Sequence, residues 1–368
     1  MPSSTLTTPL SLGSLELPNR LVMAPLTRMR SGRDGVPGEL NVEHYTQRAS
    51  IGLIVTEGTY PDETGQGFAF QPGIATAEQI EGWRRVTDSV HAAGGRIFLQ
   101  VMHAGRVTHP GLTGGRQPVA PSALAVQGQG HTYSGKTDYP VPRALDAEEL
   151  PGVVEQFVRA SRNAIEAGMD GVELHGANGY LLHEFLAPGS NERTDQYGGS
   201  PENRARFVVE VVRAVAEAIG PEKVGLRVSP EHNIQDAWEL EHEDTMATYV
   251  ALAGGIADLG LAYLSVLHRK PQGELVQALR GAFGGVLLAN TGFATVSTRE
   301  EGVRLLEEDV ADCVVVGRPA IANPDLARRW AEGLPENEPD PRTFYSQGAE
   351  GYTDYPAYEA EAEAVAAR

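Results

Sequence analysis

The sequence predicts a single α/β domain folded as a (β/α)8 TIM barrel. Short apolar runs recur about eight times along the 368 residues, and each leads into a helical pattern or a loop before one. No Gly-x-Gly-x-x-Gly turn, typical of an open dinucleotide-binding sheet, follows any of these runs. The chain length also suits one large barrel. We therefore expect one domain over residues 1–368.

The elements follow in order along the chain. Short apolar pieces around Pro9, Gly13 and Pro18 predict an N-terminal β-hairpin that caps the barrel. The expected barrel strands are 21–24, 53–56, 97–101, 172–174, 224–228, 263–267, 286–289 and 313–316. The expected covering helices are 77–93, 147–167, 202–219, 244–259 and 299–308. Asp146 and Ser200 supply N-cap chemistry for two of them.

Two segments depart from this alternation. Residues 103–145 are rich in Gly, Pro, Ser and Thr and far exceed an ordinary βα loop, so we expect a long excursion after the third strand that forms a lid or substrate wall. Residues 357–368 form an acidic tail in which Ala alternates with Glu.

Composition limits the partners. The formal net charge of −19 argues against nucleic acid and anionic membranes, since both are polyanions. A single cysteine, Cys313, excludes intrachain disulfides and cysteine-ligated metal sites, and its apolar neighbours predict a buried core position. No stretch resembles a signal peptide or a membrane span. We expect a cytoplasmic enzyme with a small-molecule substrate and no metal, as a monomer or homodimer.

Polar residues collect at the carboxyl ends of the expected strands, where barrels place their chemistry. His175, Asn178 and Tyr180 follow the fourth strand within six residues. Glycine turns after the seventh and eighth strands, with Arg318, match a phosphate site because backbone N–H groups can approach an anion there. The other strand-end candidates are Pro25, Leu26, Thr27, Gly58, Gln100, Arg227, Gly292 and Gly317.

A phosphate-loop pattern offers a different function. Residues 130–137, Gly-His-Thr-Tyr-Ser-Gly-Lys-Thr, match the phosphate-loop motif of nucleoside triphosphatases. That motif needs a helix directly after it, whose first N–H groups hold the phosphates. Pro140 and Pro142 oppose such a helix, so this alternative is disfavoured.

The motifs together resemble the old yellow enzyme family of FMN-dependent ene-reductases. The matching segments are His175-Gly-Ala-Asn-Gly-Tyr-Leu-Leu-His-Glu-Phe-Leu186, Met23-Ala-Pro-Leu-Thr-Arg28, Gln100-x-x-His-x-Gly-Arg106, Leu226-Arg-Val-Ser-Pro230, the segment 316–324 and Ala349-Glu-Gly-Tyr-Thr-Asp-Tyr-Pro356. They occur in family order over nearly the whole chain. The related dienoyl-CoA reductases need a cysteine-ligated cluster, which one cysteine cannot supply.

The resemblance implies noncovalent FMN, NADPH or NADH as electron donor, and reduction of the activated C=C bond of α,β-unsaturated carbonyl compounds, extending to nitroalkenes, nitroaromatics or nitrate esters. It implies that His175 and Asn178 bind the substrate's oxygen and that Tyr180 donates a proton. Around FMN it implies Thr27 at flavin O4, with the remaining contacts from Pro25, Leu26, Gly58, Gln100, Arg227, Gly292, Phe293, Gly317, Arg318 and Tyr345.

Departures from the family pattern bear on specificity. Phe68 stands at a substrate-side position where many relatives carry tyrosine, and Met102 replaces a common tryptophan, so we expect a less polar pocket there. The segment 267–273 differs from the usual loop on a face where loops select substrate. Thr27 places the chain with the threonine-type branch of the family.

Overall fold

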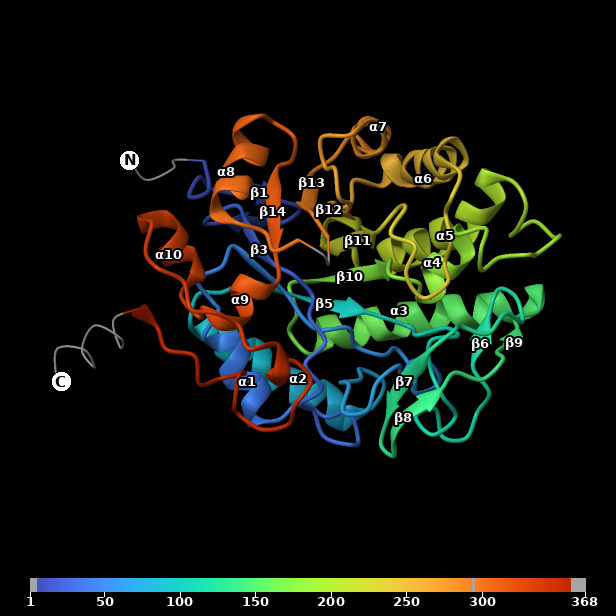
Figure 1. The fold of residues 1–368 in the computed structure, drawn as a ribbon, viewed down its shortest axis with the longest axis horizontal. Coiled ribbons are helices and arrows are strands. Elements are labelled where there is room, and N and C mark those ends of the chain that lie inside the picture. The colour runs from blue at the N-terminus through green and yellow to red at the C-terminus, as the bar shows by residue number, and fades with distance from the viewer. Residues whose placement is uncertain (1–4, 293–294, 359–368) are drawn as a thin grey trace.

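The computed structural model describes residues 5–292 and 295–358, and within them it confirms the predicted barrel (Figure 1). Parallel strands pair in sequence order, and the last strand pairs with the first, Val315 opposite Val22, to close the barrel. The barrel strands are β3 (Leu21–Met23), β4 (Leu53–Val55), β5 (Ile97–Val101), β10 (Gly171–Gly176), β11 (Val224–Val228), β12 (Tyr263–Leu267), β13 (Leu287–Asn290) and β14 (Cys313–Val316).

Helices surround the strands on the outside of the barrel (Figure 1). They are α1 (Glu39–Thr46), α2 (Ala77–Ala92), α3 (Leu150–Glu166), α4 (Leu181–Leu186), α5 (Pro201–Ile219), α6 (His242–Ile256), α7 (Glu274–Phe283), α8 (Arg299–Glu307), α9 (Arg318–Ala322) and α10 (Leu326–Glu332). The 3-10 turns are η1 (Glu63–Gly65), η2 (Ala147–Glu149), η3 (Pro221–Lys223), η4 (Ala257–Leu259) and η5 (Pro341–Thr343). The expected helix 147–167 therefore begins as the turn η2, and the expected helix 244–259 ends as η4.

Local chemistry explains where these helices begin. The Ser200 hydroxyl accepts from the Asn203 N–H at the start of α5, and Pro201 occupies the first helical position, where no N–H is needed. Thr76 caps α2 in the same way through the N–H of Gln79. Each cap satisfies a donor that would otherwise lack a partner.

The predicted N-terminal hairpin closes one end of the barrel. Strands β1 (Leu10–Leu12) and β2 (Leu15–Leu17) pair antiparallel, and Leu12 and Leu17 pack on the interior side chains of Phe98 and Tyr263. Gly13 makes the turn at φ 56°, where an added Cβ would lie 2.0 Å from a backbone oxygen of Glu222. The hairpin covers the first residues of the strands, which leaves the carboxyl ends open for a site.

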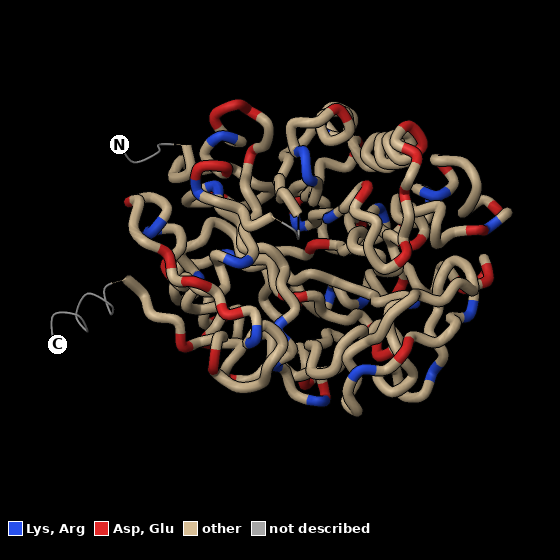
Figure 2. The backbone as a smooth tube through the Cα atoms, viewed as in Figure 1, with Lys and Arg blue, Asp and Glu red and all other residues tan. Residues whose placement is uncertain are grey.

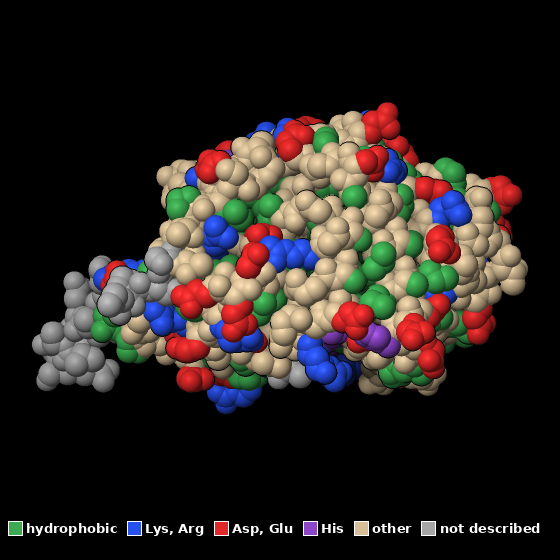
Figure 3. All heavy atoms as spheres, turned by 90° about the horizontal axis from the view of Figure 1, so that it is seen from above, with side chains coloured by type: hydrophobic (Ala, Val, Ile, Leu, Met, Phe, Trp, Pro, Cys, Tyr) green, Lys and Arg blue, Asp and Glu red, His purple; other side chains and the backbone are tan. Residues whose placement is uncertain are grey.

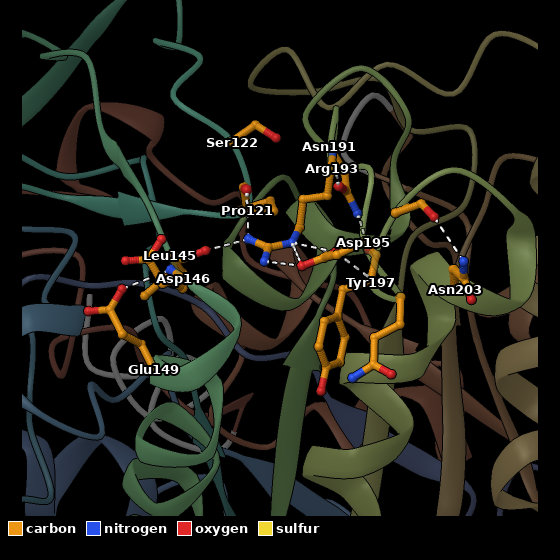
Figure 4. A network of polar contacts seen from close by, with 12 residues as sticks. Pro121, Ser122, Leu145, Asp146, Glu149, Asn191, Arg193, Asp195, Tyr197 and Asn203 are labelled. Atoms are coloured by element: carbon orange, nitrogen blue, oxygen red, sulfur yellow. Dashed lines mark hydrogen bonds and ion pairs between the residues drawn. The ribbon is translucent and has the colours of Figure 1, made fainter.

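The excursion after β5 contains two small sheets that the sequence did not reveal. Strands β6 (Val119–Ala120) and β9 (Arg143–Ala144) pair in parallel, and β7 (Gln129–Thr132) pairs with β8 (Gly135–Asp138) as a hairpin. Arg193 fastens the excursion to the barrel, because its guanidinium donates to the carbonyls of Pro121 and Leu145 and pairs with Asp195 (Figure 4). These contacts attach the excursion to the segment after α4, and its role as a lid or substrate wall stays a prediction.

Charge is spread along the chain. Cationic and anionic positions are interspersed in Figure 2, and acidic side chains are scattered over the face shown in Figure 3. Cys313 is buried and free, as predicted.

None of the helices that the structure describes has the length and apolar character needed to cross a membrane. The single-domain organisation over 1–368 stays a prediction, and the tail from residue 359 onward lies outside the described residues.

Candidate active site

A cavity of about 760 Å³ lies at the carboxyl ends of the barrel strands and gathers most of the predicted site residues. Those that line it are Pro25, Leu26, Thr27, Phe68, Gln100, Met102, His175, Asn178, Tyr180, Arg227, Gly292, Arg318 and Tyr345. They lie at or after the carboxyl ends of seven barrel strands, β3, β4, β5, β10, β11, β13 and β14, except for Tyr345, which lies in the C-terminal part of the chain. Phe293 lies outside the described residues.

Two predicted glycines lie behind the cavity wall. An added Cβ at Gly58 would be 2.6 Å from the Met102 sulfur, so the bare backbone lets Met102 pack there. A Cβ at Gly317 would meet the Leu26 side chain at an ordinary 3.6 Å. Neither glycine lines the cavity, and their predicted contact with FMN stays a prediction.

A tight turn presents the catalytic candidates at the end of β10. Asn178 and Gly179 adopt left-handed conformations with φ of 59° and 76°. Asparagine tolerates this region, while Gly179 also lies against Gln235, whose Cβ would be 2.8 Å from an added one. The N–H of Asn178 donates to the Ser229 hydroxyl and that of Gly179 to His183 Nδ1, both at 2.8 Å.

A buried pair stands behind this turn. His183 Nε2 lies 3.2 Å from a carboxylate oxygen of Glu239, and both side chains are inaccessible to solvent. Because Nδ1 accepts from the Gly179 N–H, the proton of a neutral ring is on Nε2 and faces that carboxylate. Both ring nitrogens of His183 therefore face groups of the protein itself.

Hydrogen bonding sets the tautomer of His175. The Gln100 amide nitrogen lies 3.1 Å from His175 Nδ1 and 2.8 Å from a Glu173 oxygen, so the amide donates on this side. Burial, followed by the nearby Arg227 charge, holds the pKa of His175 well below its usual value of 6.5. The ring is neutral at pH 7 and carries its proton on Nε2.

Arg227 is the buried cation of the site. Its guanidinium donates to the Ser265 hydroxyl at 3.3 Å and to the Asn290 side-chain oxygen at 3.4 Å. Glu173, on the neighbouring strand, contributes an opposite charge, although burial raises the pKa of Glu173. The Nε atom of Arg227 and the side-chain oxygen of Asn178 are buried without a hydrogen-bond partner in the described residues. Such atoms fit a ligand that supplies both donors and acceptors, as the pyrimidine edge of FMN and a substrate do.

Tyr180 is the N-cap residue of α4 and is 8% exposed. Its ring centre lies 5.3 Å from that of His175 and 6.4 Å from that of Phe68. Burial raises the pKa of Tyr180 above its usual value near 10, and a hydrogen bond from the Gln235 side chain acts in the opposite direction. The phenol is therefore protonated at neutral pH and faces the cavity.

The loop after β11, residues 229–241, contributes cavity residues that the sequence analysis missed: His232, Asn233, Ile234 and Gln235. Four of its non-glycine residues, Glu231, Asn233, Gln235 and Asp236, have positive φ. Asn and Asp are enriched in such conformations, which was the available signal. Arg28, Arg269, Thr291, Thr295, Ile321 and Phe344 also line the cavity without having been predicted.

A C-terminal strap, residues 343–353, supplies one wall through Phe344 and Tyr345. Arg28 donates to the carbonyl of Gly351 at 2.7 Å, and Arg30 donates to those of Thr343 and Gly348 at 2.8 and 2.9 Å. Both guanidinium groups also lie over the Tyr352 ring, at 5.0 and 4.5 Å from its centre. The first βα loop and the strap are thereby held together.

A profile of the NADH:flavin oxidoreductase / NADH oxidase family matches residues 5–337. The chain belongs to this family. A probable flavin mononucleotide-dependent alkene reductase of Leishmania infantum is 45% identical over 361 residues, covering 95% of this chain and 96% of that protein. Membership in the NADH:flavin oxidoreductase family confirms the predicted kind of enzyme, an FMN-dependent oxidoreductase with a nicotinamide donor.

Solved structures agree with this family assignment. The old yellow enzyme homologue from Zymomonas mobilis is 40% identical, with a TM-score of 0.90 over 96% of this chain and 99% of that one. Morphinone reductase in complex with tetrahydroNAD is 46% identical, with a TM-score of 0.89 over 96% and 97%. The resemblance to old yellow enzyme and the predicted reduction of activated C=C bonds are confirmed, while the threonine-type branch stays a prediction.

The phosphate-loop alternative does not fit the structure. Residues 130–137 span the β7–β8 hairpin, in which Gly130 pairs with Thr137, and the chain continues into β9. No helix begins at this motif, so the N–H groups of a helix start are missing there.

Proposed function

We propose that His175, Asn178 and Tyr180 perform the ene-reduction and that the surrounding strand ends hold FMN. The observation that carries this assignment is the convergence of these three side chains on one cavity, where His175 is neutral and Tyr180 keeps its proton. FMN, when bound, supplies hydride to the substrate after taking it from the nicotinamide donor.

His175 and Asn178 bind the substrate's carbonyl or nitro oxygen. Negative charge builds on that oxygen as hydride reaches the β-carbon, and hydrogen-bond donors already in place stabilise it. His175 Nε2 is a donor because Gln100 fixes the other nitrogen as an acceptor. The Asn178 amide, held by the Ser229 contact to its backbone, provides the second donor.

Tyr180 protonates the α-carbon. A phenol whose pKa lies above its usual value keeps its proton until a strongly basic carbanion forms beside it. Phe68 and Met102 form the apolar side of this part of the cavity, which excludes water from the reacting carbon.

The residues for FMN follow from the same cavity. Thr27 and Gln100 would contact the polar edge of the flavin ring, Arg227 would place its charge there, and Gly292 and Arg318 would hold the phosphate. The unpartnered Nε of Arg227 supports this placement. Tyr345, which is 55% exposed, would cover the ring from the strap.

The proposal also covers the substrate range, the location and the oligomeric state of the enzyme. The enzyme acts on nitroalkenes, nitroaromatics or nitrate esters as well as on enones. It works in the cytoplasm, which the single free thiol supports. It is a monomer or a homodimer, which its molecular mass in solution will decide.

The test starts with the absorbance spectrum of the purified protein. About one equivalent of noncovalent FMN is expected. Anaerobic addition of NADPH should bleach the flavin band, and cyclohexenone should restore it. A colourless protein that cannot be reconstituted with FMN would contradict the proposal.

A further inference from the structure

Asn178 lines the active-site cavity from a turn with an unfavourable backbone conformation. Its φ of 59° lies in the left-handed region, which asparagine tolerates but does not prefer. Its side-chain oxygen is buried without a hydrogen-bond partner in the described residues. A donor that stabilises charge on a substrate oxygen has to be in place before the reaction. The contacts that hold the backbone of Asn178 therefore decide where its amide points.

Two hydrogen bonds hold the peptide groups on either side of the Asn178 Cα atom. The N–H of Asn178 donates to Ser229 Oγ, and the N–H of Gly179 donates to His183 Nδ1, both at 2.8 Å. The first bond fixes the peptide group before the Cα atom, and the second fixes the peptide group after it. Because each peptide group is planar, the two bonds together fix the direction of the Cα–Cβ bond. His183 therefore acts on Asn178 through the peptide group between Asn178 and Gly179.

Glu239 sets the tautomer that His183 needs for this contact. Nδ1 accepts from an N–H only when the ring proton is on Nε2, and Nε2 lies 3.2 Å from a carboxylate oxygen of Glu239. The other oxygen accepts from the N–H of Glu231 at 2.7 Å. The N–H of Glu239 donates to the Asn233 side-chain oxygen at 2.6 Å. The loop after β11 thus holds in place the carboxylate that faces the ring.

His183 is separated from the substrate site by the turn. Its side chain is inaccessible to solvent, and it is not among the described residues that line the active-site cavity. One ring nitrogen accepts from the turn that carries Asn178, and the other faces the loop that begins at Ser229. Both anchors of Asn178 are therefore connected through this loop.

We propose that His183, oriented by Glu239, is a positioning residue that directs the Asn178 amide at the substrate's oxygen. The inference rests on the proposed function, in which Asn178 donates to that oxygen. Removal of the acceptor at residue 183 then weakens binding of the oxygen and leaves FMN in place. Because His183 acts through Asn178, its effect cannot exceed that of removing the Asn178 amide.

Titration of the flavin absorbance with 4-hydroxybenzaldehyde measures this binding in the holoenzyme. Asn178→Ala should raise the Kd roughly tenfold or more, through loss of a hydrogen bond to a charged oxygen. His183→Leu should raise the Kd roughly fivefold, whereas His183→Asn, whose side-chain oxygen can replace Nδ1 as acceptor, should stay within about twofold of wild type. The FMN content of all three variants should equal that of wild type. Thr87→Val, a control, removes another buried side-chain hydrogen bond, to the Ala167 carbonyl between α2 and the end of α3, and should not change the Kd.

A double-mutant cycle separates positioning from general destabilisation. In the Asn178→Ala background, His183→Leu should cause no further change in Kd, since the amide that it positions is gone. An equal effect of His183→Leu in both backgrounds would overturn the inference, and so would an unchanged Kd in the wild-type background. If Asn178→Ala itself leaves the Kd unchanged, Asn178 does not bind the ligand's oxygen and the proposed function is wrong.

The tautomer of His183 gives a second readout, which decides the question if His183→Leu does not fold. Long-range proton–nitrogen NMR spectra of wild-type holoenzyme with labelled histidine should show Nδ1 of this ring without a proton and Nε2 with one. The signals that disappear in His183→Asn identify the ring. A protonated Nδ1 would overturn the inference, because the N–H of Gly179 could then not donate to it.

Discussion

Replacing Tyr180 by Phe tests the proposed proton donor separately from the other residues of the site. The change removes a hydroxyl and keeps the ring, so the contacts with His175 and Phe68 at 5.3 and 6.4 Å are preserved. Neither the predicted FMN contacts nor the position of the substrate oxygen depends on that hydroxyl. We therefore expect normal FMN content and normal flavin reduction by NADPH.

The second half of the reaction should slow strongly. A positioned general acid typically contributes roughly 10²–10⁴-fold, equivalent to about 3–5 kcal/mol of activation free energy. Stopped-flow reoxidation of the pre-reduced variant by cyclohexenone measures this loss directly. Because burial raises the pKa of Tyr180, the wild-type enzyme should not lose this proton donor between pH 6 and about pH 10.

Tyr197→Phe is a suitable control, because it removes a buried tyrosine's hydroxyl bonded to Glu210, away from the cavity. The proton-donor assignment is wrong if Tyr180→Phe slows flavin reduction as much as enone reduction. It is equally wrong if enone reduction keeps its wild-type rate across several substrates.

Three further changes test other parts of the molecule. Arg318→Ala should weaken FMN affinity by roughly tenfold or more through loss of a phosphate contact, and unchanged retention on dialysis would place the phosphate elsewhere. His175→Ala should weaken the binding of phenol-type ligands, measured by flavin absorbance titration, and unaltered titration curves would remove His175 from the oxygen site. Burial raises the pKa of Glu184 to about 8, so this carboxyl destabilises the folded state increasingly as pH rises from about 4.5 to about 8. In urea titrations, the unfolding free energy of Glu184→Gln relative to wild type should increase by on the order of 1–3 kcal/mol between pH 5 and pH 8.5. The same difference for Glu192→Gln, a change at an exposed carboxyl, should not vary with pH. A parallel pH dependence of Glu184→Gln and wild type would refute the reasoning.

The sequence predicted the barrel well because its strands are short, buried on both faces and separated by amphipathic helices. It missed α1, whose Glu-Leu-Asn-Val-Glu-His-Tyr-Thr sequence has almost no apolar stripe. It also missed the β7–β8 hairpin, since the residues of both strands are mainly polar and show no apolar alternation.

The part of the site that could be predicted consists of residues that lie close together in the sequence. His175, Asn178 and Tyr180 share one strand end, so their spacing alone indicated a cluster. The protonation states depended on Gln100 and Arg227 from other strands, which only the barrel register brings near. The loop after β11 depends on left-handed residues whose strain is offset by tertiary contacts such as the Gln127 N–H bond to Asp236. No local pattern encodes such contacts.

The strap has a consequence for biosynthesis. Arg28 and its partner Gly351 are 323 positions apart, and the last barrel strand ends at Val316, before the strap begins. On the ribosome, every barrel strand has therefore been synthesised while Phe344 and Tyr345, one wall of the cavity, are still to come. A chain that ends before residue 343 would therefore contain every barrel strand and still lack the cavity wall that Phe344 and Tyr345 form.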